Sequence, residues 1–80
     1  MTNSDEIFYY IQTLLVNRFG VEEEGIVPSM TFNELGADSL DIVELVMEME
    51  HQFDVHFSDE KLAELTTLEE AVTYIKELKQ

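Results

Sequence analysis

The 80-residue sequence is long enough for one small domain, expected over residues 1–80, and too short for two. Eighteen acidic residues against four Lys or Arg give a net charge of −14, which disfavours nucleic acid and anionic membranes as partners and favours basic proteins. Because the chain contains no cysteine, it has no disulfide, thiolate nucleophile or Cys-based metal site. It has neither an apolar run long enough for a membrane span nor a basic signal-peptide start, so we expect a cytoplasmic protein without membrane insertion.

The first predicted element is an amphipathic helix that begins at Asn3 and stops at Gly20. Asn3 can act as the N-cap, and Glu6 stands three residues later, as a capping box requires. Apolar residues then recur at intervals of three and four, and glycine is a common C-terminal stop. The predicted apolar face contains Ile7, Ile11, Leu14, Leu15 and Phe19.

A long connection is expected over residues 20–37, which contain three glycines and the only proline. Such a loop in a compact domain is usually functional or is tied down by its own side chains, and a short helical turn fits within it. The side chains expected to anchor it to the core are Ile26, Val27, Phe32 and Leu35.

Three further helices are predicted after this connection: Ser39–Phe53, a short one over Asp59–Leu65, and one that ends near Lys79. The last begins after Thr67, an N-cap with Glu70 as its capping-box partner. No segment alternates as a half-buried strand does. The predicted fold class is therefore all-α: a small four-helix bundle, three main helices and one short helix, with a long loop between the first two. We expect a monomer.

The second predicted helix carries two apolar stripes when its residues are advanced by about 100° each. The stripe expected to face the core contains Ile42, Leu45, Val46, Met49 and Phe53. The stripe on the other side contains Leu40, Val43 and Met47, with Asp41, Glu44 and Glu48 along one border. Either the bundle covers this second stripe, or it is a docking face whose carboxylates steer Lys and Arg of a partner.

Ser39 stands at the head of the same helix. A serine in this place is usually a cap. Here Asp38 is the better cap, with Asp41 three residues later as its partner, which leaves Ser39 at the first helical position. Its hydroxyl is then free at the positive end of a helix, where a phosphate group is stabilised.

The stretch "LGADSLD", residues 35–41, followed by "VELVMEMEHQFD", residues 43–54, resembles the acyl carrier proteins of fatty acid biosynthesis. The similarity runs from about Asn3 to Lys79. The resemblance implies that Ser39 carries 4′-phosphopantetheine through a phosphodiester, and that acyl intermediates travel as thioesters on the terminal thiol. The implied partners are a phosphopantetheinyl transferase, or holo-synthase, and acyl-processing enzymes with basic docking patches. The protein itself would then be a carrier and not an enzyme.

The resemblance also implies roles for both stripes of the second helix. The partner-recognition residues would be Asp38, Leu40, Asp41, Val43, Glu44, Met47 and Glu48. An acyl chain held between the helices would be lined by Val46, Met49, Phe57, Leu65, Ala71 and Tyr74, each of which is also an ordinary core residue. His51, His56 and Ser58 depart from the common family pattern, so a specialised pathway stays open.

Other readings of the sequence are weaker. A catalytic triad of Ser39, His51 and a carboxylate is disfavoured, since residues twelve apart on a helix lie about 18 Å apart along its axis. No EF-hand loop is present and no metal site is predicted, although clustered carboxylates leave weak Mg²⁺ or Ca²⁺ binding open. A discrete polyketide carrier, a D-alanyl carrier and a non-covalent acidic protein-binding module remain as alternatives.

Overall fold

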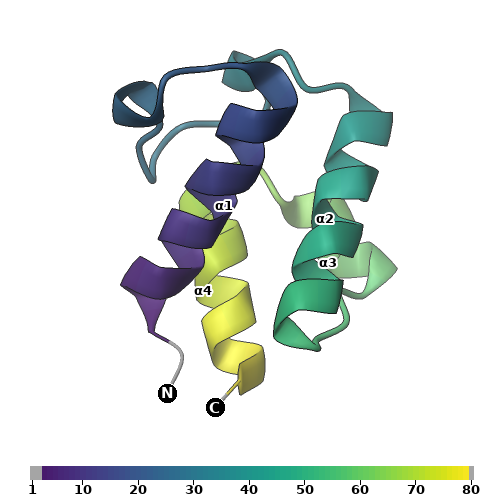
Figure 1. Ribbon diagram of the computed structural model, residues 1–80. Helices are drawn as coiled ribbons and strands as arrows, with labels where there is room; N and C mark the ends of the chain where they lie inside the picture. The colour runs from purple at the N-terminus through teal and green to yellow at the C-terminus, as the bar shows by residue number, and fades with distance from the viewer. Residues whose placement is uncertain (1–2, 80) are drawn as a thin grey trace.

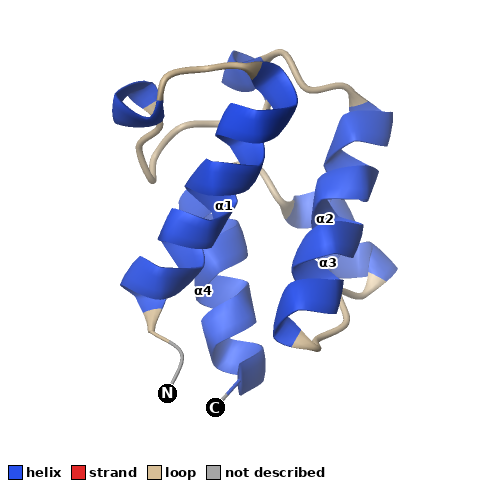
Figure 2. Cartoon of the chain, in the orientation of Figure 1, coloured by secondary structure: helices blue, strands red, loops and turns tan. Residues whose placement is uncertain are grey.

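The computed structural model describes residues 3–79, so the outermost positions of the expected domain, 1, 2 and 80, lie outside the described residues. Its four α-helices surround one core (Figure 1). Two short 3₁₀ turns lie in the long connection, and the described residues contain no strand, only an isolated bridge between Thr31 and Thr67 (Figure 2). The all-α prediction is confirmed. The elements are α1 (Ser4–Phe19), η1 (Glu23–Gly25), η2 (Asn33–Leu35), α2 (Ser39–Phe53), α3 (Asp59–Glu64) and α4 (Leu68–Lys79).

The helix boundaries follow the capping signals closely. The Thr67 hydroxyl accepts the Glu70 N–H at 3.2 Å, and the Glu70 carboxylate accepts the Thr67 N–H at 3.0 Å, which completes the predicted box at α4. At α1 the Asn3 side chain caps the Glu6 N–H at 2.9 Å, but the Glu6 carboxylate accepts from the Asn3 side-chain amide. The prediction for α3 was one residue too long, because Leu65 is already extended, with φ −65° and ψ 126°.

The core lies between α1, α2 and α4, with α1 running opposite to the other two (Figure 1). Its members come from the apolar periodicity of each helix, from the long connection and from the segment after α2. Burial of this apolar surface is the main stabilising term in a domain of this size. The buried residues are Ile7, Ile11, Leu15, Ile26, Phe32, Ala37, Leu45, Val46, Met49, Phe57, Leu68, Ala71, Val72 and Ile75.

The long connection is anchored by side chains and by backbone hydrogen bonds. Ile26 and Phe32 are each 3% exposed, whereas Val27 is 44% exposed, so its predicted anchoring role was wrong. The carbonyl oxygens of Pro28 and Met30 accept the first N–H groups of α4, at 2.8 and 3.0 Å. Since these N–H groups have no partner within a helix, the loop and the start of α4 satisfy each other. This ordered loop leads directly into the start of α2.

Candidate functional site

A complete capping box opens α2 and fixes the orientation of its first turn. The Asp38 carboxylate accepts the Asp41 N–H at 2.9 Å, and the Asp41 carboxylate accepts the Asp38 N–H at 3.2 Å. Two residues earlier, Gly36 has a left-handed φ of 82°, a conformation that strains other residues, and Ala37 is buried. These contacts therefore define the backbone conformation at the point where α2 begins.

Ser39 is the first residue of α2, and its side chain is exposed. The structure shows no hydrogen bond from its hydroxyl to another of the described residues, because Asp38 does the capping. The N–H groups of a first helical turn have no helical partner and carry the positive end of the helix dipole. Ser39 thus combines an accessible oxygen, a fixed backbone and a favourable field for an anion, and so fits a phosphate ester.

The two apolar stripes of α2 differ sharply in exposure. Leu45, Val46 and Met49 are only 1–2% exposed and belong to the core. On the other side, Leu40 is 65% exposed and Met47 60%. The third residue of that stripe, Val43, is 44% exposed, so the bundle does not cover it. We call Leu40, Val43 and Met47 the outer strip. Its apolar surface is available on the helix that begins at Ser39.

Two of the carboxylates beside the outer strip are paired within the molecule, which the sequence analysis did not foresee. Arg18, in the last turn of α1, hydrogen-bonds to the Glu44 carboxylate, and its Nη2 lies 3.7 Å from Asp41 Oδ1. α1 ends and α2 begins at the same end of the bundle, which brings these residues together (Figure 1). The only hint of this pairing in the sequence was that Arg18 is the single Lys or Arg before Lys61.

The third flanking carboxylate, Glu48, is exposed and lies close enough to Tyr10 of α1 to act on its phenol. The nearby Tyr10 packs edge-on against Phe53, with ring centroids 5.2 Å apart. Burial raises the pKa of the Tyr10 phenol, and the negative charge of Glu48 adds to the rise. The Glu48 side chain forms no hydrogen bond or ion pair with another residue in the range 3–79, which leaves its carboxylate available to solvent or to a partner.

The residues predicted to line an acyl chain form two groups. Four of them, Val46, Met49, Phe57 and Ala71, are at most 2% exposed, and Leu65 and Tyr74 are partly buried at the edge of the core. Phe57 and Tyr74 form an edge-to-face pair with centroids 4.8 Å apart. Because this interior is closely packed, it holds a chain only if the helices separate.

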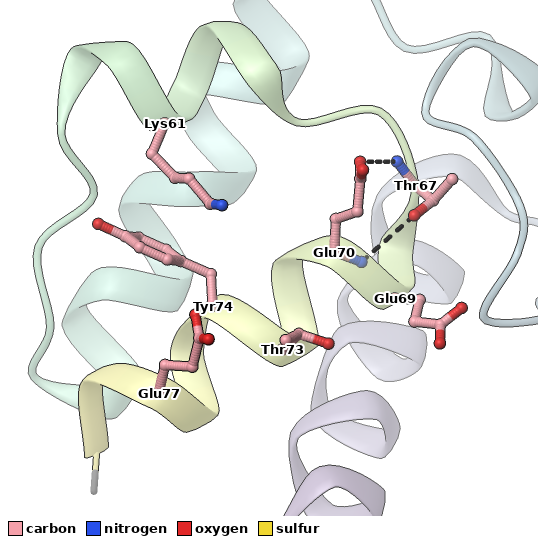
Figure 3. Close-up of a pocket in the computed structure, with 7 residues that line it drawn as sticks. All are labelled: Lys61, Thr67, Glu69, Glu70, Thr73, Tyr74 and Glu77. Carbon is pink, nitrogen blue, oxygen red and sulfur yellow. Dashed lines mark hydrogen bonds between the residues drawn. The ribbon is translucent and has the colours of Figure 1, made fainter.

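A shallow hollow of about 380 Å³ lies between α3 and α4 (Figure 3). The Lys61 ammonium sits 4.9 Å from the centre of the Tyr74 ring, and the dashed lines mark the capping box of Thr67 and Glu70. Hydrogen bonds from the N–H groups of Thr67 and Thr66 hold the pKa of the Glu70 carboxyl below its usual value. This polar hollow does not include Ser39, and of the predicted acyl-chain residues only Tyr74 borders it.

The two histidines lie at the far end of α2. The Glu50 carboxylate accepts the Phe57 N–H at 2.7 Å and lies 3.3 Å from His56 Nδ1, so it pins the turn into α3. His51 is exposed in the last turn of α2, whereas Ser39 is in the first. Within residues 3–79, no three His, Asp or Glu side chains are grouped as a metal site requires. Nor does any helix of this part combine the length and apolar character needed to cross a bilayer.

Comparison with known proteins agrees with this arrangement. The family model described as "Phosphopantetheine attachment site" matches residues 10–75, which include Ser39 and all of α2. The structure is similar to an acyl carrier protein from Enterococcus faecalis, with 27% identity, a TM-score of 0.83, and coverage of 96% of this chain and 99% of that one. It also shares its fold with an acyl carrier protein from Thermotoga maritima, with 23% identity, a TM-score of 0.82, and coverage of 94% and 88%.

The chain belongs to the phosphopantetheine attachment family, whose domain is the site of covalent 4′-phosphopantetheine. The family match and the similarity to the Enterococcus faecalis protein together support a role as a carrier of acyl groups. The resemblance to acyl carrier proteins that the sequence indicated is thereby confirmed. Members of this family act as carriers between a phosphopantetheinyl transferase and acyl-processing enzymes.

Proposed function

We propose that Ser39 is the attachment residue and that the chain shuttles acyl intermediates between the enzymes of fatty acid biosynthesis in the cytoplasm. One observation carries the proposal. Ser39 presents an exposed hydroxyl, with no hydrogen-bond partner among residues 3–79, at the first position of a helix that Asp38 and Asp41 have already capped. The capping box frees the serine from a structural role and leaves the positive end of α2 for a phosphodiester.

Attachment requires the Ser39 oxygen to reach a transferase active site. Ser39 Oγ forms a bond to the phosphorus of the phosphopantetheinyl group of coenzyme A, adenosine 3′,5′-bisphosphate leaves, and the hydroxyl proton passes to a base of the transferase. When bound, the group supplies a terminal thiol that holds cargo as a thioester, which this cysteine-free chain cannot provide. The roles of the protein are to present the serine and to dock.

Docking is assigned to the outer strip and its carboxylates. Leu40, Val43 and Met47 supply apolar area, and Asp38, Asp41, Glu44 and Glu48 face basic patches on the transferase and on acyl-processing enzymes. Contacts between exposed charges are weakened by salt and release quickly, as a shuttle requires. The negative charge of the chain steers it toward such patches and away from nucleic acid.

The inner face of α2 has a second proposed role. A bound acyl chain lies among Val46, Met49, Phe57 and Ala71, with Leu65 and Tyr74 at the edge. Since these side chains are packed together without cargo, entry of a chain separates α2 from α3 and α4. No residue is assigned a catalytic role, and the protein is proposed to act as a monomeric carrier, a single domain, and not as an enzyme.

The test is an intact mass before and after incubation with coenzyme A and a promiscuous phosphopantetheinyl transferase. Wild type gains one phosphopantetheinyl group, or already carries it, and Ser39→Ala gains none. An unmodified, folded wild type that gains nothing would contradict the proposal and favour a non-covalent acidic binding module, which the charge of −14 also suits. The outer strip would then be the first surface to test for binding of a non-covalent partner.

The pathway needs a separate measurement on the loaded protein. The loaded carrier is expected to accept a malonyl group and to support chain elongation by purified fatty acid synthesis enzymes. The comparison reactions are extension by a polyketide synthase and charging with D-alanine. Activity in one of these, without elongation of a fatty acid, would transfer the assignment to that pathway.

A further inference from the structure

Arg18 is an isolated positive charge in an acidic stretch of the chain. It is the only Lys or Arg before Lys61, and it lies in the last turn of α1 rather than on α2. Its side chain reaches across to the first turns of α2, where it hydrogen-bonds to Glu44 and approaches Asp41 to 3.7 Å. All three side chains remain partly exposed, at 30% for Arg18 and Asp41 and 47% for Glu44.

The carboxylates along the outer strip therefore differ in what they already bind. Asp41 uses one oxygen for the capping box with Asp38 and turns the other toward Arg18. Glu44 is occupied by the Arg18 guanidinium. One turn further along α2, the carboxylate of Glu48 forms no hydrogen bond or ion pair within the described residues. Of these three, a basic partner thus meets one carboxylate, Glu48, that is unpaired within the described residues, and two that already hold an internal base. Asp38, the fourth carboxylate assigned to docking, accepts the Asp41 N–H as the helix cap.

We propose that Arg18 is an internal competitor for the basic groups of docking partners, an inference that rests on the proposed docking role of α2. In the free protein the guanidinium occupies Asp41 and Glu44. A partner's Lys or Arg gains those carboxylates only by displacing Arg18 or by sharing them with it. Arg18 thereby limits the affinity of the face and speeds release, and Glu48 is the first point of contact.

The physics sets the size of the effect. Exposed ion pairs in water are weak, so displacement of Arg18 is feasible during docking. Replacing Arg18 with a neutral side chain is expected to raise kcat/KM for loading of Ser39 by about two- to fivefold, the change that corresponds to one exposed pair. The charge of the whole chain also rises in magnitude, which needs a matched control.

Lys79→Gln is that control, because it removes one positive charge from an exposed position in the last turn of α4. Loading rates of wild type, Arg18→Gln and Lys79→Gln are measured with one transferase and coenzyme A at low and at moderate ionic strength. We expect Arg18→Gln to load faster than both of the others, with a steeper dependence on salt. Thermal melts check that all three proteins are folded.

A double-mutant cycle locates the effect. Glu44→Gln is expected to slow loading more in the Arg18→Gln background than in wild type, because in wild type the partner must first displace Arg18 from Glu44 or share it. If Arg18→Gln fails to fold, Arg18→Met removes the charge and keeps the apolar stem for the same comparison.

Two outcomes would overturn the inference and are distinct from each other. Loading of folded Arg18→Gln at or below the rate of Lys79→Gln would make Arg18 a structural tie between α1 and α2, or itself a contact for the partner. Absence of loading in wild type would instead overturn the proposed function, and the inference with it.

Discussion

The two faces of α2 carry the same kind of apolar side chain, but one face is buried and the other is exposed to solvent. Met49 is 1% exposed and Met47 is 60% exposed, although only one residue separates them on the same helix. Folding explains the inner face, since burying apolar surface stabilises the bundle. It does not explain the outer strip, which remains in water. This difference in exposure is the reason we propose that the outer strip binds a partner instead of stabilising the core.

The largest expected effect is on stability and comes from the inner face. Met49→Ala is expected to lower the free energy of unfolding by about 2–5 kcal/mol, because it leaves a cavity in a packed core. Met47→Ala, its matched control, should change it by less than about 0.5 kcal/mol. Urea denaturation followed by circular dichroism measures both. Equal losses in the two variants would mean that the outer strip is part of the core.

The next effect is on docking and comes from the outer strip. Leu40→Ala is expected to reduce kcat/KM for loading of Ser39 by about tenfold, the loss typical of a central interface residue. Leu78→Ala removes a leucine of α4 that is 41% exposed and serves as the control. If the Leu40 variant loads at the control rate, the outer strip has no part in recognition by the transferase.

Asp38 has two roles to separate, since it caps α2 and is also one of the proposed docking carboxylates. Asp38→Ala is expected to cost about 1 kcal/mol through loss of the cap, a fall in melting temperature of about 4–8 °C. Asp38→Asn keeps the cap and removes the charge, so it should melt near wild type while loading more slowly. A melting temperature for Asp38→Asn as low as that of Asp38→Ala would show that the charge, and not the cap, stabilises the helix.

The smallest expected effect is on the pH dependence of stability and comes from Glu70, a capping carboxylate that lies on α4 and not on α2. The pKa of Glu70 is lowered in the folded protein by the N–H groups of Thr67 and Thr66, so its ionised form stabilises the fold. That contribution is complete above the usual pKa of glutamate and disappears as the pH falls through the lower, folded value.

Urea unfolding across this acidic range tests the point with Glu70→Ala. Its deficit relative to wild type should be largest near neutral pH and should shrink on acidification. The neighbouring variant Glu69→Ala should show no such convergence, because no hydrogen bond to the Glu69 carboxylate appears within the described residues. A deficit for Glu70→Ala that is constant with pH would contradict the role of the charge.

Local signals in the sequence were enough for most of the fold and for the head of α2. Capping residues fixed the starts of α2 and α4, and the helical period separated Leu45 from Leu40. The failures concern contacts between distant segments. Arg18 meets Glu44 across 26 residues, and Val27 faces solvent because the loop turns toward α4 through Pro28 and Met30. Periodicity carries no information on such pairings.

We propose above all that the outer face of α2, headed by Ser39, is the surface that partner enzymes bind. A ¹H–¹⁵N NMR titration of the unmodified protein with a phosphopantetheinyl transferase at low ionic strength tests it most directly. We predict that the perturbed backbone amides cluster over residues 36–48 and that salt reverses the changes. Perturbations centred on α4, with the amides of Ser39 and Leu40 unaffected, would contradict the claim.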